Sequence, residues 1–140
     1  MRYPIILLAV LALALTAGTA RADCPDSDIV YARNCRDLPV EGDSLQSQGC
    51  MVVYWTFEFF RTSETNGNCI VVAEIKNTSF SITIDSRDPR YSEPHSHHSI
   101  SGTDVIFGSP VQARMRMKRP SSHYAPGPFS NLKLSYNIVE

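Results

Sequence analysis

The sequence lacks a second long hydrophobic run and any recognisable catalytic motif. Its one extended apolar segment, Ile5–Leu15, lies near the start of the 140-residue chain. Nothing after it approaches the roughly 20 apolar residues that a membrane-spanning helix needs, so we expect no membrane span in the mature chain. The GxSxG turn that presents a catalytic serine is missing, and the acidic residues are scattered along the chain. We therefore predict a protein without enzymatic activity.

The first 22 residues have the three parts of a secretory signal peptide. Arg2 supplies the positive start, Ile5–Leu15 forms the apolar part, and Ala20-Arg21-Ala22 provides the small residues at the cleavage site. We predict a signal peptide over residues 1–22 and one secreted, extracellular domain over residues 23–140. Cleavage would remove two of the 13 basic residues, leaving 11 against 14 acidic ones and a net charge of −3. A nucleic-acid-binding domain is usually basic, so nucleic acid is not an expected partner.

No cysteine follows Cys69, and no CxxC pair is present. The cysteines of the predicted mature chain are even in number: Cys24, Cys35, Cys50 and Cys69. This pattern predicts two disulfides in an oxidising compartment and offers no zinc knuckle, so we expect neither a metal nor another cofactor.

The pairing of the cysteines depends on a predicted hairpin. Asn66-Gly67 is a turn signal between Met51–Phe60 and Cys69–Lys76. Such a hairpin would put Cys50 and Cys69 about 30 Å apart at about 3.3 Å per residue, too far for a disulfide. Two arrangements remain open. We favour Cys24–Cys69 with Cys35–Cys50, because the latter pair brackets a short polar loop, over Cys24–Cys50 with Cys35–Cys69.

Beyond the signal peptide, no stretch of ten or more residues has helical periodicity. Apolar residues instead alternate with polar ones in several short runs, which is typical of half-buried strands. The alternating runs lie at Val53–Phe59, Phe80–Asp85, Val111–Lys118 and Leu132–Ile138, and Ile70–Ile75 is apolar enough to be buried on both faces. Clusters of turn-forming residues separate them, including Ser86–Ser99. The pattern predicts an all-β fold, a small antiparallel β-sandwich with two disulfides, with an open barrel as the alternative.

A row of basic residues is the strongest binding motif. Strand alternation places Arg114, Arg116 and Lys118 on one face, with Met115 and Met117 on the other. Cations about 7 Å apart suit acidic glycans, acidic lipid headgroups or an acidic protein. The competing interpretation is an ordinary solvated strand whose cations pair with some of the acidic residues.

Histidines form the second candidate cluster. His95 and His97 are two residues apart, so in an extended segment both rings face one way, with His98 beside them and Glu93 or His123 as further candidate ligands. Serine and proline surround this run, which favours a solvated polar loop. We expect no bound metal here.

Asn77-Thr78-Ser79 matches the sequence that accepts N-linked glycans. It follows the apolar run Ile70–Ile75 and is expected to lie in a turn. In a secreted eukaryotic protein this position would make the chain a glycoprotein, with Asn77 as the attachment site.

Two stretches resemble a CUB or nematode-type CUB-like domain. Cys50 opens an aromatic strand with Trp55 (CMVVYWTFEF), and Gly127-Pro128-Phe129 leads into a final strand that contains Tyr136. The resemblance implies a secreted β-sandwich, of the jelly-roll or CUB-like kind, that recognises proteins or glycans. The family's later cysteine pair has no counterpart. Its calcium-binding members place an aspartate after the third cysteine, where this chain continues apolar from Ile70, so no calcium ligands are carried over.

These features together predict a secreted, non-enzymatic recognition module for an extracellular acidic glycan or protein. We place the contacts at the basic row. One alternative is a small carrier of lipids or other hydrophobic ligands, with Trp55, Phe57, Phe59 and two methionines lining a cavity between the sheets. Another is a secreted effector, such as a venom, matrix or immune factor, that acts on a protein target.

Overall fold

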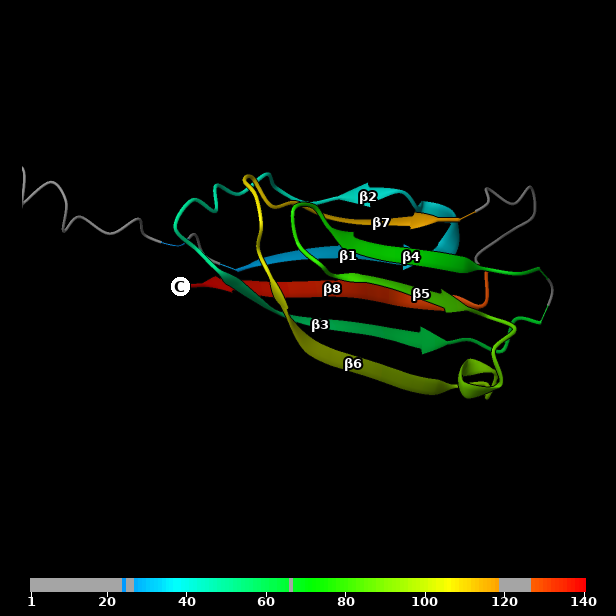
Figure 1. Ribbon diagram of the computed structural model, residues 1–140. Helices are drawn as coiled ribbons and strands as arrows, with labels where there is room; N and C mark the ends of the chain where they lie inside the picture. Colours follow the sequence, from blue (N-terminus) through cyan, green and yellow to red (C-terminus); the bar gives the residue numbers. More distant parts are fainter. Residues whose placement is uncertain (1–23, 25–26, 66, 119–126) are drawn as a thin grey trace, which may run out of the picture.

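The computed structural model places eight strands in two antiparallel sheets (Figure 1). It describes residues 24, 27–65, 67–118 and 127–140. Sheet A has the order β1-β8-β3-β6, and sheet B has the order β2-β7-β4-β5. The elements are β1 (Asp28–Asn34), η1 (Cys35–Asp37), β2 (Val40–Glu41), β3 (Val52–Arg61), β4 (Ile70–Ile75), β5 (Ser81–Asp85), η2 (Pro89–Tyr91), β6 (Ser96–Val105), β7 (Ala113–Met117) and β8 (Phe129–Val139). The all-β fold with two sheets and two disulfides confirms the predicted fold class.

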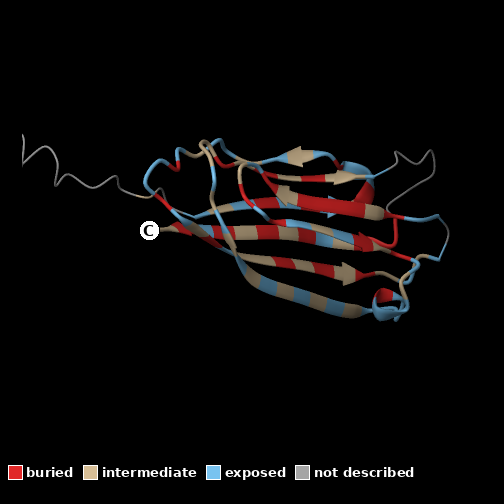
Figure 2. Cartoon of the chain, viewed as in Figure 1, coloured by how far each residue is buried: buried red, intermediate tan, exposed pale blue. Residues whose placement is uncertain are grey.

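The facing sides of the two sheets form one hydrophobic core (Figure 2). Sheet A contributes residues with no exposed surface at Val53, Phe57 and Phe59, and sheet B contributes Val71 and Met115. The alternation in Val53–Phe59 therefore predicted the buried face correctly. Trp55 points to the same side but is only partly buried, because it packs near the β6 edge of sheet A.

The predicted hairpin between β3 and β4 is wrong. Strand β3 pairs with β6 and β8 in sheet A, whereas β4 pairs with β5 and β7 in sheet B. The chain crosses from one layer to the other between these strands. Two strands that each present one apolar face to the same core have the same alternation whether they pair side by side or lie in opposite layers.

The disulfides are Cys24–Cys50 and Cys35–Cys69. The favoured pairing was therefore wrong, and the second arrangement left open by the sequence is the one found. Cys35 follows β1 of sheet A and Cys69 precedes β4 of sheet B, so this bridge joins the two layers. Cys50 precedes β3 of sheet A and is bridged to Cys24, the first described residue.

Strand β6 begins within the segment that was expected to be a turn. Ser96–Ser99 belong to this strand, which pairs with β3 over ten consecutive residues. The expectation failed because polar residues occupy both faces of β6. Its outer face meets solvent, and none of its residues is fully buried, even on the side that faces sheet B (Figure 2).

Among the described residues, no helix is long and apolar enough to span a membrane. The predicted signal peptide, residues 1–22, lies outside the described residues.

Candidate binding surface

The predicted basic row lies on the outer face of sheet B. In β7, Ala113 and Met115 have no exposed surface, while Arg114 and Arg116, which alternate with them, point away from the core. Lys118 follows the strand and stays in register, because its backbone nitrogen donates to the carbonyl of Ile70 at 2.8 Å. The three cations therefore share one face, as the alternation predicted. Their role as binding residues stays a prediction.

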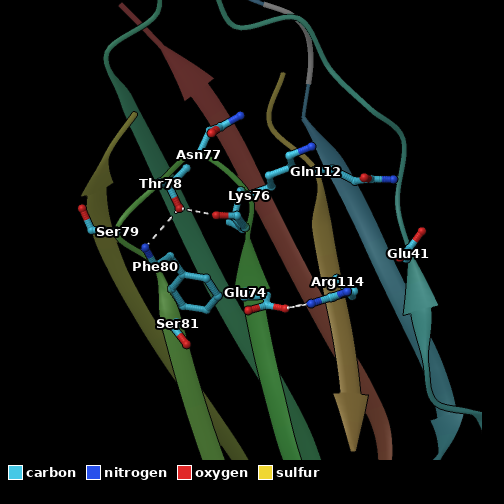
Figure 3. Close-up of a pocket in the computed structure, with 11 residues that line it drawn as sticks. Glu41, Glu74, Lys76, Asn77, Thr78, Ser79, Phe80, Ser81, Gln112 and Arg114 are labelled. Carbon is cyan, nitrogen blue, oxygen red and sulfur yellow. Dashed lines mark hydrogen bonds and ion pairs between the residues drawn. The ribbon is translucent and has the colours of Figure 1, made fainter. Parts of the chain in front are cut away.

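Glu74 is the acidic centre of this row. It lies directly opposite Arg114 on the neighbouring strand β4. One carboxylate oxygen accepts hydrogen bonds from Nε of Arg114 at 2.9 Å and from Nη2 of the same guanidinium (Figure 3). The same oxygen lies 3.6 Å from Nε of Arg116. The two arginines thus share a single carboxylate.

Sequence reasoning missed Glu74 as a partner of the row. The only signal was its position as the one charged residue in the apolar run of β4. That signal becomes useful only when β4 is known to pair with β7, and strand order is not visible in alternation.

The shared carboxylate leaves positive charge on this face. The positive charges on this face are Lys76, Arg87, Arg114, Arg116 and Lys118, and the negative ones are Glu41, Glu74 and Asp85, which leaves an excess of two. The side chains of Arg114, Arg116 and Glu74 are 44%, 39% and 28% exposed. Pairs this open to solvent contribute at most about 1 kcal/mol to folding. Their charges therefore remain accessible to a ligand.

Two hollows flank Arg114. One has a volume of about 540 Å³ and is lined by the β4–β5 turn together with Glu41, Glu74 and Gln112 (Figure 3). The other, of about 330 Å³, is lined by Leu38, Pro39, Glu41, Arg114, Arg116 and Met117. A small acidic group in either hollow would meet the Arg114 guanidinium.

The turn between β4 and β5 forms the rim of the larger hollow and contains the predicted glycosylation site. Asn77 has a φ of 62° and is half-buried, and its Nδ2 donates to the carbonyl of Pro110 at 2.7 Å. The Thr78 hydroxyl donates to the carbonyl of Ile75 at 2.7 Å and accepts from the Phe80 nitrogen at 3.0 Å. The sequon therefore lies in a turn, as predicted. Glycosylation of Asn77 stays a prediction.

The histidines spread over both faces of sheet A. His97 lies on the outer face, 3.7 Å from Glu58, which also pairs with Lys133 at 3.1 Å. His95 precedes β6 with a φ of 61°, and its ring centre lies 6.4 Å from that of Phe60, the residue opposite His97.

His98 points to the inner side, where it stacks on Phe59 at 5.1 Å and meets the edge of Tyr91. Among the described residues, no group of three or more histidine, cysteine, aspartate or glutamate side chains is arranged to hold a metal. His123 lies outside that part of the chain.

Arg61 is a second charged residue with specific partners that sequence reasoning missed. Although charged, it is only 7% exposed. Its Nη1 donates to the carbonyl of Ser86 at 2.6 Å and, more weakly, to that of Tyr91 at 3.4 Å. The alternation that buries Val53, Phe57 and Phe59 continues to position 61, so the signal was present in the sequence. Arg61 holds the end of β3 to the segment before β6, which is a structural role.

No family model, curated protein or solved structure matches the chain. The resemblance to CUB-like domains therefore stays a prediction, and the surface must be interpreted from its own chemistry.

Proposed function

We propose that the protein is a secreted, non-enzymatic module that binds an acidic extracellular glycan on the outer face of sheet B. The observation that carries the proposal is the row Arg114, Arg116 and Lys118, in which the two arginines share the carboxylate of Glu74 and line the neighbouring hollows. The two disulfides support it, because they indicate an oxidising environment such as that of exported proteins.

The chemistry of the row fits sulfate or carboxylate groups spaced along a chain. A guanidinium has five N–H donors, and in Arg114 only one from Nε and one from Nη2 are donated to Glu74. The remaining donors of Arg114 and those of Arg116 are available for charge-assisted hydrogen bonds to an anion. The exposed ammonium of Lys118 extends the row by another strand step. Glu74 then acts as the group that orients both guanidinium groups.

Binding to a sulfated oligosaccharide, measured by calorimetry at increasing salt, tests the proposal. We expect affinity to fall as salt rises, because ions screen exposed charges over about 10 Å at 0.1 M. The double variant Arg116→Ser/Lys118→Ser should lose at least about tenfold in affinity, since two charge-assisted contacts are removed. This variant leaves the Arg114–Glu74 pair intact.

The matched control removes the same charge from the other sheet. Arg33 is exposed on β1 and Lys133 lies on the outer face of sheet A, so Arg33→Ser/Lys133→Ser lowers the net charge equally. The control should bind like the wild type. Equal losses in the two double variants would mean that the ligand responds to total charge, and the proposed surface would be wrong.

The carrier alternative has no comparable observation in its favour. Phe57, Phe59 and Met115, which were expected to line its cavity, have no exposed surface and pack in the shared core. Both hollows described above have the charged side chains of Glu41 and Arg114 in their lining.

A further inference from the structure

Strand β6 is the longest edge strand of the molecule. Each sheet ends in two strands that pair on one side only: β1 and β6 in sheet A, and β2 and β5 in sheet B. Strands β2, β5 and β1 contain two, five and seven residues, whereas β6 contains ten (Figure 1). From Ser96 to Asp104 its far side has no strand beside it among the described residues, and at Val105 the carbonyl accepts a hydrogen bond from the Ser79 nitrogen at 3.3 Å.

The register shows which backbone groups face that side. The nitrogen of Ile106 donates to the carbonyl of Met51 at 2.8 Å, in line with the β3–β6 register. The backbone N–H and C=O groups of successive residues point alternately to the two sides of a strand. In β6, those of the even-numbered residues therefore point toward β3. The backbone groups of His97, Ser99, Ser101 and Thr103 therefore point to the free edge.

Strand β6 carries few of the usual devices that protect an edge: Asp104 points inward, and the turn Asn77–Ser79 covers only the end of the strand, at Val105. It contains no proline, lysine or arginine, and its ten pairs with β3 run without a bulge. Natural proteins normally protect long edge strands by such means, since an unprotected edge pairs readily with another strand. The bulge that does occur in sheet A lies between β3 and β8, away from this edge.

The inner side of β6 also leaves apolar surface incompletely covered. Ile100 and Trp55 pack against the core but are only partly buried. The Trp55 ring lies over Gly102, where an added Cβ would be 2.6 Å from a ring carbon, and its Nε1 donates to Asp104 at 2.6 Å. A strand placed beside β6 would cover this apolar strip as well as satisfy the free backbone groups.

We propose that two copies of the chain join through β6, antiparallel and across a two-fold axis at Ser101. A second copy fits because β6 is nearly uncharged and complementary to itself in this register. Ser101 faces its own copy, and Ser99 faces Thr103 on the outer side, where paired hydroxyl side chains stabilise neighbouring strands. On the inner side, His98 faces Asp104 of the second copy, the one acidic residue of the strand.

The same register covers the apolar strip. Ile100 faces Gly102 of the second copy, beside the Trp55 ring that lies on that glycine. The two sheets A become one continuous sheet of eight strands, and the basic row on sheet B stays outside the joint. The inference is therefore independent of the proposed glycan site.

Sedimentation of the wild type from about 1 µM to about 1 mM tests for the dimer, over a range that covers weak association. We expect a concentration-dependent dimer. Ser101→Pro removes an N–H that the monomer does not use, and proline is tolerated where an edge strand faces outward. This variant should be monomeric with a thermal midpoint close to that of the wild type, while the control Ser101→Ala should still dimerise.

Cysteine variants test the register and do not depend on the proline variant folding. Opposed residues in an antiparallel pair lie about 5.5 Å apart, so Ser101→Cys should form a disulfide-linked dimer on mild oxidation. In the same register, the two copies of position 99 are four residues out of step, about 13 Å at 3.3 Å per residue, so Ser99→Cys should not. A wild type that stays monomeric at the highest concentration overturns the proposal. So does cross-linking through position 99 in place of 101.

Discussion

At the scale of single residues, alternation predicted direction well and partners poorly. It placed Val53, Phe57 and Phe59 inward and Arg114 and Arg116 outward, and the structure agrees. Direction follows from the two-residue period of a strand, which the sequence states directly. The partner of a side chain depends on which strand lies next to it, and this is why Glu74 was missed.

Tyr136 shows the energetic consequence of an inward-pointing polar group. It is 2% exposed, and burial, together with the nearby carboxylates of Asp28 and Asp43, raises the pKa of its phenol well above the ordinary value. Such a group is kept neutral by the folded state. Its contribution to stability is fully present below pH 10, the ordinary pKa of the unfolded chain, and is lost as pH rises beyond it.

We therefore predict that Tyr136→Phe will resist alkaline unfolding better than the wild type. Above pH 10, the buried phenol makes stability fall by up to about 1.4 kcal/mol per pH unit, and the variant lacks this loss. Unfolding followed by circular dichroism between pH 8 and pH 12 measures the effect. Tyr54→Phe is the control, because Tyr54 is 53% exposed. The interpretation is wrong if both variants shift the alkaline midpoint equally.

At the scale of elements, the sequence predicted strands where one face is apolar and failed where neither is. The strands β3, β7 and β8 bury one face in the core, β4 also buries Val72 on its other face, and all four were recognised. The edge strand β6 has polar residues on both faces, and its first four residues, Ser96–Ser99, were expected to be part of a turn. The pairing of strands was also beyond reach, because β3 and β4 share a core without sharing a sheet.

The two disulfides close loops of similar length but differ in how deeply they are buried. Cys24–Cys50 and Cys35–Cys69 span 26 and 34 residues, so chain entropy alone makes their contributions differ by only about 0.2 kcal/mol. Burial distinguishes them. Cys35 and Cys69 are 3% and 1% exposed and belong to the core, whereas Cys24 is only partly buried.

We expect Cys35→Ala/Cys69→Ala to destabilise the protein more than Cys24→Ala/Cys50→Ala, by about 1–2 kcal/mol, because it also leaves a cavity between the sheets. Urea unfolding of the two double variants measures the difference. Each serves as the control for the other, since each removes one bridge. Equal midpoints would show that the inter-sheet bridge adds nothing beyond chain entropy.

At the scale of the whole molecule, the predicted signal peptide and the two disulfides both indicate an oxidising compartment. A signal peptide, as predicted over residues 1–22, would send the chain to an oxidising compartment, and the two disulfides indicate such an environment. Every cysteine of the chain is bridged. The sheets hold one core in common, so no part of the described chain forms a second folding unit.

This agreement leads to a prediction for the exported protein. Expressed with its own leader in a eukaryotic secretory host, the chain should appear in the medium beginning at Asp23, because small residues occupy the cleavage site at Ala20 and Ala22. After enzymatic removal of N-linked glycans, intact-mass analysis should match residues 23–140. Reduction should then add the mass of four hydrogen atoms, two for each of the two bridges.

A protein that retains Met1 would contradict the prediction, since an uncleaved leader would anchor the chain. A protein that reacts with a thiol reagent before reduction would also contradict it, since a free thiol would mean an incomplete bridge. Expression without residues 1–22 in a reducing cytosol is the control, and it should give a chain with four reactive thiols and lower stability.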